Sequence, residues 1–340
     1  AQTLGGSLGA GAGGSINEYR MQEMWWPAYL PTWLRGDDLL WSKMLMPSFR
    51  AFTNEYRVRG LLGNSLYTAE YLAIIFPFVV YFFTRATQLS RQLLLASAVL
   101  AATMAMYFTG SRSAMVGVVL TMAIYPLLEA LRIRRQRPTS LTASTVFYAY
   151  PIGVAVTAAI IIFWRRATVL IRGGGQHQAS TDARAAQWEM GWPIIIRHPL
   201  GHAVGRSGES LGYFNPGSET PTVDSYYLTL LLDYGFLGLA FFVALFSVAI
   251  WFAGRAHLRA RDEETLLLAP LAISLVNFLV IKSAASSETN FPIIFIMLGA
   301  TIALVARVRA EADDLQPTPA VVAAVRKRPA RPAPQPGVAS

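Results

Sequence analysis

The sequence predicts an all-α polytopic membrane protein with about seven transmembrane helices and one large polar loop. Of its 340 residues, 54% are hydrophobic and only 14% are charged, and the mean hydropathy is +0.39. A soluble domain carries about 25% charged residues, so much of this surface is expected to face lipid. Apolar stretches of about the length that crosses a bilayer recur along the chain. They lack the alternation of outer-membrane strands, which leaves helices as the fold that satisfies its backbone in lipid.

The predicted spans divide the chain into five parts. An N-terminal segment (1–64) precedes four helices (65–164), a large loop (165–225), three further helices (226–308) and a disordered tail (309–340). The seven expected spans are Ser65–Phe83, Leu93–Phe108, Ala114–Leu131, Thr145–Trp164, Tyr226–Phe252, Leu266–Lys282 and Phe291–Val308.

The short loops predict the orientation of these helices. If seven spans alternate, the arginines of three loops and of the tail all fall on one side, whereas the opposite loops are mixed or nearly neutral. Cytoplasmic loops are enriched in Lys and Arg, so we expect the large loop to face outward and the tail to face the cytoplasm. The net charge of +9 is thereby explained as a topology signal, and no nucleic-acid partner is predicted. The arginines are Arg85, Arg91, Arg132, Arg134, Arg135, Arg137, Arg255, Arg259, Arg261, Arg307 and Arg309.

The two ends of the chain carry weaker signals. Ala1–Gly14 is rich in Gly and Ala and is expected to be disordered, and the aromatic residues that follow it are typical of a membrane interface. Because the chain starts at Ala1 without a signal peptide, we expect earlier spans to precede it. The basic cluster Arg326–Arg331 either touches anionic headgroups or, as the favoured interpretation, makes the tail soluble and fixes its side. The aromatic residues are Trp25, Trp26, Tyr29, Trp33 and Trp41.

Arginines stand at the expected outer ends of two spans. Arg57 and Arg59 precede a turn predicted from the nearby glycines and Asn64. Arg112 lies in a connection of only a few residues, where the start of the next helix, expected at Ser113, would also present backbone amides to an anion. The planar guanidinium group binds phosphate in a bidentate manner. The alternative is an arginine that reaches from the interface to lipid headgroups.

The large loop concentrates further candidates. Arg184 and Trp188 are four residues apart, which predicts one face of an amphipathic helix, Ala183–Ile196, lying on the membrane and continued by Trp192 and Ile196. A sharp loop with His198, several glycines and Arg206 follows. A single histidine is more often a structural hydrogen-bonding group than a functional one.

Asp224 lies where the chain returns to the membrane. It is either the N-cap of the next helix or a base that accepts a proton from a substrate hydroxyl. Tyr226 and Tyr227 beside it are either interface anchors or platforms for stacking sugars. Asp233, inside the span and two residues before Gly235, requires a partner or a water-lined cavity.

Four segments carry a resemblance: RVRGLLGNSLYTAEYL, TGSRSAM, RAAQWEMGWPIIIRHPLGHAVG and VDSYYLTLLLDYGFLGL. In this order they resemble the O-antigen ligase and O-antigen polymerase superfamily of bacterial inner-membrane glycosyltransferases, from about Arg57 to about Val308. The resemblance implies more spans than this chain holds, a large periplasmic loop and a glycan donor linked to polyprenyl pyrophosphate. Arg57, Arg112 and Arg184 match the family's pyrophosphate- or glycan-binding arginines.

One departure bears on the reaction. Ligases of the superfamily carry a His-Asn pair where this chain has Asp224-Ser225, so the resemblance favours a polymerase of surface polysaccharide over a ligase that transfers glycan to a lipid A-type acceptor. Asp224 is then the expected general base, and arginines neutralise the leaving pyrophosphate without a metal or other cofactor. A transporter of lipid-linked glycans and a scaffold in a polysaccharide export assembly are the alternatives. Charges placed mainly at the outer boundary favour an enzyme over a transporter.

Overall fold

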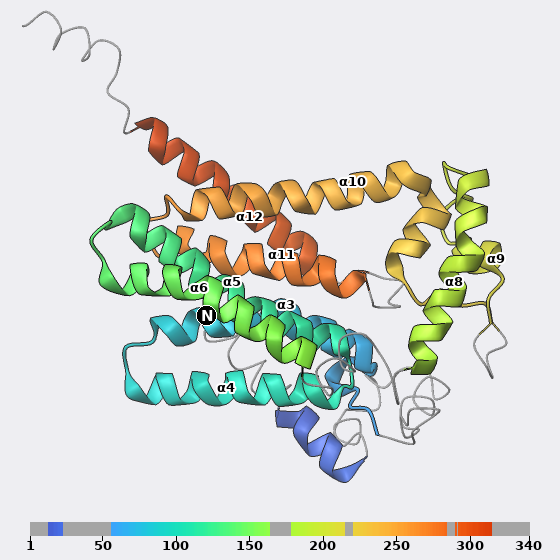
Figure 1. Ribbon diagram of the computed structural model, residues 1–340, viewed down its shortest axis with the longest axis horizontal. Helices are drawn as coiled ribbons and strands as arrows, with labels where there is room; N and C mark the ends of the chain where they lie inside the picture. Colours follow the sequence, from blue (N-terminus) through green and yellow to red (C-terminus); the bar gives the residue numbers. More distant parts are fainter. Residues whose placement is uncertain are drawn as a thin grey trace, which may run out of the picture.

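The computed structural model describes residues 13–22, 56–163, 178–214, 220–283, 290 and 292–314, and these residues form helices and loops without a β-strand. Figure 1 shows long helices lying side by side, with α8 crossing one end of the bundle. The all-α prediction is confirmed. The interfacial aromatic residues between Trp25 and Trp41 and the basic cluster of the tail lie outside the described residues.

The spans lie close to their predicted positions. Six helices are long and apolar enough to cross a membrane, and the fourth expected span holds a shorter apolar stretch, Leu141–Val156. The helices of the bundle are α3 (Ser65–Arg85), α4 (Leu89–Phe108), α5 (Arg112–Gln136), α6 (Leu141–Phe163), α10 (Tyr226–His257), α11 (Leu268–Lys282) and α12 (Pro292–Asp314); α8 (Gln178–Arg197) and the short α9 (Ser207–Leu211) belong to the large loop.

Three predicted boundaries were wrong. Helix α12 continues to Asp314, so the first residues of the expected disordered tail are helical. Helix α5 begins at Arg112 and not at Ser113. A helix at 13–21 begins inside the stretch predicted to be disordered, and its Tyr19 ring stacks on Phe108 at 4.0 Å between ring centroids. This N-terminal helix thus makes a contact with α4, and the local composition of the sequence could not reveal that contact.

Helix α11 forms the centre of the bundle through buried polar contacts. The Asn277 amide donates to the backbone oxygen of Ala73 at 2.9 Å and to the Thr121 hydroxyl at 3.0 Å. The Ser274 hydroxyl donates to the backbone oxygen of Ile74 at 2.6 Å. Unsatisfied polar groups are costly in lipid, and these bonds satisfy two donors while joining α11 to α3 and α5.

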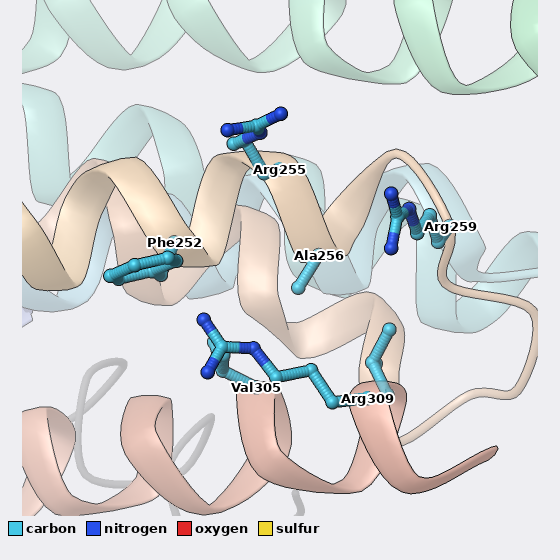
Figure 2. Close-up of a pocket in the computed structure, with 7 residues that line it drawn as sticks. Phe252, Arg255, Ala256, Arg259, Val305 and Arg309 are labelled. Carbon is cyan, nitrogen blue, oxygen red and sulfur yellow. The ribbon is translucent and has the colours of Figure 1, made fainter. Parts of the chain in front are cut away.

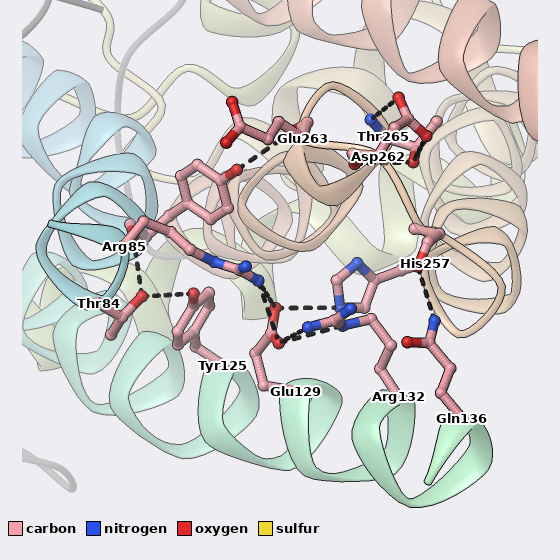
Figure 3. Close-up of polar contacts among 12 residues, drawn as sticks. Thr84, Arg85, Tyr125, Glu129, Arg132, Gln136, His257, Asp262, Glu263 and Thr265 are labelled. Atoms are coloured by element: carbon pink, nitrogen blue, oxygen red, sulfur yellow. Dashed lines mark hydrogen bonds and ion pairs between the residues drawn. The ribbon is translucent and has the colours of Figure 1, made fainter. Parts of the chain in front are cut away.

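The connections alternate between the two ends of the bundle, as predicted. At one end Glu129 on α5 accepts from Arg85 of α3 at 3.3 Å and from Arg132 at 2.8 Å, and it lies 3.5 Å from His257 of α10 (Figure 3). Basic residues expected on a common side therefore do meet at one end. The α4–α5 connection and α8 lie at the other (Figure 1).

Helix α10 breaks at Gly235, and the loop after α8 fills the break. Gly235 has φ +68° and ψ −165°, a conformation essentially restricted to glycine. Three backbone hydrogen bonds, all between 2.8 and 3.2 Å, join the two segments: His202 N to Leu232 O, Ala203 N to Asp233 O, and Phe236 N to Pro199 O.

Asp233 completes this junction. Its Oδ2 accepts from the amide of Gly205 at 3.0 Å, which supplies the partner that a carboxylate within a span requires. A Cβ on Gly235 would lie 2.1 Å from the Pro199 carbonyl oxygen, and one on Gly201 would lie 2.3 Å from that of Asp233. The two backbones are thus in direct contact, with no room for a side chain on either glycine.

We expect Gly235→Ala to lower the melting temperature of the purified protein by several degrees, because the loop must leave the break or accept a strained residue worth about 1–3 kcal/mol. Gly254→Ala on the same helix is the control, since nothing lies within 4 Å of its added Cβ. Alanine is otherwise the better helix former by about 1 kcal/mol, so equal melting temperatures for the two variants would contradict this account.

We expect a cysteine at Ser180 to react with a membrane-impermeant thiol reagent in intact spheroplasts, and one at Thr139 to react only after permeabilisation. Both side chains are exposed, at opposite ends of the bundle, and the chain has no cysteine of its own. Labelling of position 139 alone in intact cells would reverse the orientation inferred from the loop charges.

Candidate functional site

Arg57 and Arg112 meet around the connection between α4 and α5. The Arg57 Nε donates to the backbone oxygen of Thr109 at 2.9 Å, and the neighbouring amide of Val58 donates to Phe108 O at 3.2 Å. Arg112 is the first residue of α5, three positions after Thr109. The N-terminal segment thereby brings one predicted arginine to the turn that carries the other.

The next contacts connect this turn to α8 and then to Asp224. Arg112 Nη2 donates to the hydroxyl of Thr181 at 3.2 Å. One helical turn along α8, Arg184 Nε donates to the backbone oxygen of Asp224 at 3.3 Å. Four predicted residues, far apart in the sequence, therefore lie along one continuous series of contacts at one end of the bundle.

Gln187 holds Asp224 in place, and sequence analysis overlooked it. Its Nε2 donates to Asp224 Oδ2 at 3.3 Å, and its Oε1 accepts from the Asp224 amide at 2.7 Å. Gln187 is fully buried, three residues after Arg184 and therefore on the same helix face. That spacing was the signal available in the sequence. In the described part of the chain, no protein group bonds to the second carboxylate oxygen of Asp224, Oδ1.

Asp224 is not the N-cap of α10. That position belongs to Ser225, whose side chain makes no capping hydrogen bond, and the Asp224 carboxylate is turned to Gln187 instead. The structural role expected for Asp224 was therefore misassigned. Its geometry is that of a half-buried carboxylate oriented by an amide, with one oxygen engaged.

Burial is the dominant electrostatic effect on Arg184. It lowers the pKa of the guanidinium group, while the adjacent Asp224 carboxylate raises it. An arginine remains charged at neutral pH even so. Its two Nη atoms form no hydrogen bond or ion pair with a described residue, and a partly desolvated cation of this kind attracts an anion more strongly than one in water.

Arg59 contributes to the site through its backbone amide, which helps to anchor the segment before α3. Its amide and that of Gly60 donate to the carboxylate of Glu18 at 2.8 Å, and the Tyr56 hydroxyl donates to the same group at 3.0 Å. Burial raises the pKa of Glu18, and these three hydrogen bonds oppose that shift. Glu18, which the sequence did not single out, thus anchors the segment that carries Arg57.

The predicted turn before α3 is confirmed. Gly63 has φ +67°, and Asn64 caps α3 by accepting from the amides of Leu66 at 2.8 Å and Tyr67 at 3.4 Å. The turn fixes the direction in which the Arg57 segment approaches the bundle.

The face of α8 that packs on α10 is not the face that was expected to lie on the membrane. Gln187, Gly191 and Ile195 are buried, whereas Trp192 and Ile196 are 48% and 59% exposed. Positions four apart drift by about 40° per step on a helix with 3.6 residues per turn, so the expected face is not continuous. Trp188 is half-buried and packs against a small core of Ile195, Leu211, Val223, Leu228, Leu231 and Leu232.

The two tyrosines that begin α10 are engaged inside the bundle. The Tyr227 hydroxyl donates to the backbone oxygen of Leu279 at 2.7 Å, and the Tyr226 hydroxyl accepts from Asn290 Nδ2 at 2.8 Å. Tyr226 is only 8% exposed. Of the two alternatives for these residues, this geometry favours anchoring over stacking on a sugar.

A buried ion pair lies beneath them. Lys282 Nζ is 3.0 Å from Glu70 Oε1, both side chains are fully buried, and the lysine stands 4.8 Å from the Tyr226 ring centroid. This ion pair joins the end of α11 to α3, next to Tyr226 at the start of α10. Sequence analysis did not identify it, because the two charges are far apart along the chain.

His198 and Arg206 lie away from this group. They flank the loop that fills the break of α10, and His198 is about 20 Å along the axis of α8 from Arg184. The His198 and His202 rings are 4.4 Å apart. The structure thus brings together Arg57, Arg112, Arg184 and Asp224, and separates them from His198 and Arg206.

Comparison with known proteins adds one result to this geometry. Residues 96–243 match the family model described as O-antigen ligase. The matched stretch includes Arg112, Arg184 and Asp224 and leaves Arg57 outside it. No curated protein matches the chain.

Proposed function

Because residues 96–243 carry an O-antigen ligase domain, we propose that the protein polymerises polyprenyl-pyrophosphate-linked oligosaccharide repeats into surface polysaccharide. The reaction would take place at the periplasmic face of a bacterial inner membrane. The supporting observation is the series of contacts that runs from Arg57 through Arg112 and Arg184 to Asp224. It places cationic groups beside an oriented carboxylate at the end of a membrane-spanning bundle.

The proposed chemistry uses these two kinds of group. The hydroxyl oxygen of an acceptor sugar bonds to the anomeric carbon of the donor, and its proton passes to Asp224 Oδ1. The bond from that carbon to the pyrophosphate oxygen breaks, and the arginines stabilise the charge that develops on the leaving group. Attack from the opposite face inverts the anomeric centre. The scheme requires no metal or cofactor.

Gln187 has a defined part in this proposal. By engaging Oδ2 and the backbone amide of Asp224, it turns the other carboxylate oxygen away from α8. A general base must be oriented toward the proton that it accepts. Gln187 is therefore a positioning residue.

The choice of polymerase over ligase rests on Asp224-Ser225 standing where ligases of the superfamily have His-Asn. A ligase is the second candidate, favoured by the description of the matched family. The two reactions share a donor and differ in acceptor: a growing chain for the polymerase, and a lipid A-type glycolipid for the ligase.

We expect Arg112→Lys and Arg184→Lys each to lower turnover of lipid-linked repeats by about a hundredfold. Lysine keeps the charge but loses the planar donor group, and lost stabilisation of a leaving group costs a few kcal/mol. Arg197→Lys at the exposed end of α8 is the control. Wild-type turnover in both variants, with normal folding and abundance, would show that these arginines only contact lipid headgroups at the membrane interface.

We expect Asp224→Asn to fold normally and to lose about a hundredfold or more in turnover, the contribution typical of a general base. Asparagine can still accept from Gln187, and the backbone bond to Gln187 is unchanged, so only the proton acceptor is removed. The measurement is the length distribution of products made by purified protein from lipid-linked repeats alone.

Three outcomes separate the candidates. A ladder of longer chains from the wild type that disappears in Asp224→Asn supports the polymerase. Product formed only when a lipid A-type acceptor is added identifies a ligase. No product in either assay, with donor moved across vesicle membranes, would identify a transporter.

A further inference from the structure

A basic pocket lies between α10 and α12, at the end of the bundle opposite the candidate site. It has a volume of about 150 Å³ and is lined by Phe252, Arg255, Ala256, Arg259, Val305, Val308 and Arg309. Figure 2 shows the three arginine side chains standing around Ala256. They come from the last turn of α10, the residues just after it, and the facing side of α12.

The charge in this pocket is uncompensated, unlike that of its neighbour. Arg307 on α12 pairs with Asp262, Glu264 and Glu311. Among the residues that the structure describes, none of Arg255, Arg259 and Arg309 forms an ion pair with a carboxylate, and no carboxylate lines the pocket. Three positively charged side chains therefore line the pocket, and among the described residues the nearby carboxylates pair with Arg307 instead.

Two of these arginines are held in place by aromatic rings. The guanidinium carbon of Arg309 stands 4.5 Å from the centroid of Phe252, and that of Arg255 stands 5.4 Å from the centroid of Trp251. A cation over an aromatic face loses part of its conformational freedom before any ligand arrives. The ring contacts thereby limit the positions that the Arg255 and Arg309 guanidinium groups adopt at the pocket.

The floor and surroundings of the pocket are apolar. Ala256, Val305 and Val308 are buried beneath the arginines. Beyond them, along the length of the two helices, exposed Val248, Trp251 and Ile302 form part of the surface of apolar spans. A ligand in this position would have a phosphate among the arginines and hydrocarbon beside the helices.

We propose that this pocket binds the phosphodiester headgroup of an anionic glycerophospholipid. The inference goes beyond the proposed reaction and is independent of it. Guanidinium groups bind phosphate oxygens through paired hydrogen bonds, and an apolar floor suits the glycerol and first acyl carbons. A headgroup that also carries an ammonium group, as in phosphatidylethanolamine, would be repelled by the three uncompensated charges.

The lipid source is preferred over soluble phosphate because of position. The pocket lies near one end of two helices that are long and apolar enough to span a membrane and that carry exposed apolar side chains, so the ligand's acyl chains would be buried in the bilayer. Each basic residue at an anionic surface contributes about fivefold in affinity. Three arginines would thus favour an anionic lipid by about a hundredfold.

The test is native mass spectrometry of the full protein released from nanodiscs that contain equal parts phosphatidylglycerol and phosphatidylethanolamine. We expect the wild type to retain phosphatidylglycerol preferentially. The triple variant with Arg255→Gln, Arg259→Gln and Arg309→Gln should lose this preference by at least tenfold. The control carries Arg91→Gln, Arg135→Gln and Arg137→Gln, which remove the same charge from exposed positions at the same end. It should behave as the wild type does.

A single Arg259→Gln variant guards the test against misfolding, because this exposed side chain forms no hydrogen bond or ion pair with another described residue. About a fivefold loss of the lipid preference is expected. Equal retention of the two lipids by the wild type, or equal losses in the triple variant and its charge-matched control, would overturn the proposal. Displacement of bound lipid by millimolar inorganic phosphate would also overturn it, by identifying a site for soluble phosphate.

Discussion

The arrangement of the candidate site depends on the contact between two backbones at Gly235. Helix α10 stops being helical there, and the loop that follows α8 supplies hydrogen-bond partners to both sides of the break. Neither Gly235 nor Gly201 can carry a Cβ at this separation. Because the loop is continuous with α8, this contact fixes one end of the helix that carries Arg184 and Gln187. The other end is fixed by Arg112 and Asp224, so α8 is held at two separate points.

Buried polar groups make the bundle beneath the site specific. On α11, Asn277 and Ser274 donate hydrogen bonds to backbone carbonyl groups of α3, and Lys282 forms an ion pair with Glu70, which is also on α3. Breaking such a buried pair on one side costs about 3–5 kcal/mol, since the remaining charge stays in an apolar environment. These contacts therefore determine how α11 is positioned against α3. Because Lys282 also lies over the ring of Tyr226, they help to position the first turn of α10 relative to α11.

Sequence analysis identified what is encoded locally and overlooked what depends on distant contacts. Apolar length predicted the spans. Arg57 and Arg112 stood out at the ends of two spans, whereas Arg184 stood out within the large loop and by its match to the family's motif. The Asn64 turn was recognised because its signal lies within a few residues. Glu18 and Lys282 escaped attention because their partners are tens or hundreds of residues away. Asp224 was considered for the N-cap position that Ser225 occupies, since only the folded chain shows that Gln187 engages the Asp224 carboxylate.

Arg184 differs from the arginines near Glu129 in the kind of group that accepts its hydrogen bond. Near Glu129, the charges of Arg85 and Arg132 are neutralised by a carboxylate, which is the arrangement expected for groups that serve structure. Arg184 is partly desolvated yet bonds to a backbone oxygen, and a neutral acceptor leaves its charge in place. A desolvated cation that keeps its charge costs folding free energy, and an anionic ligand would recover part of that cost.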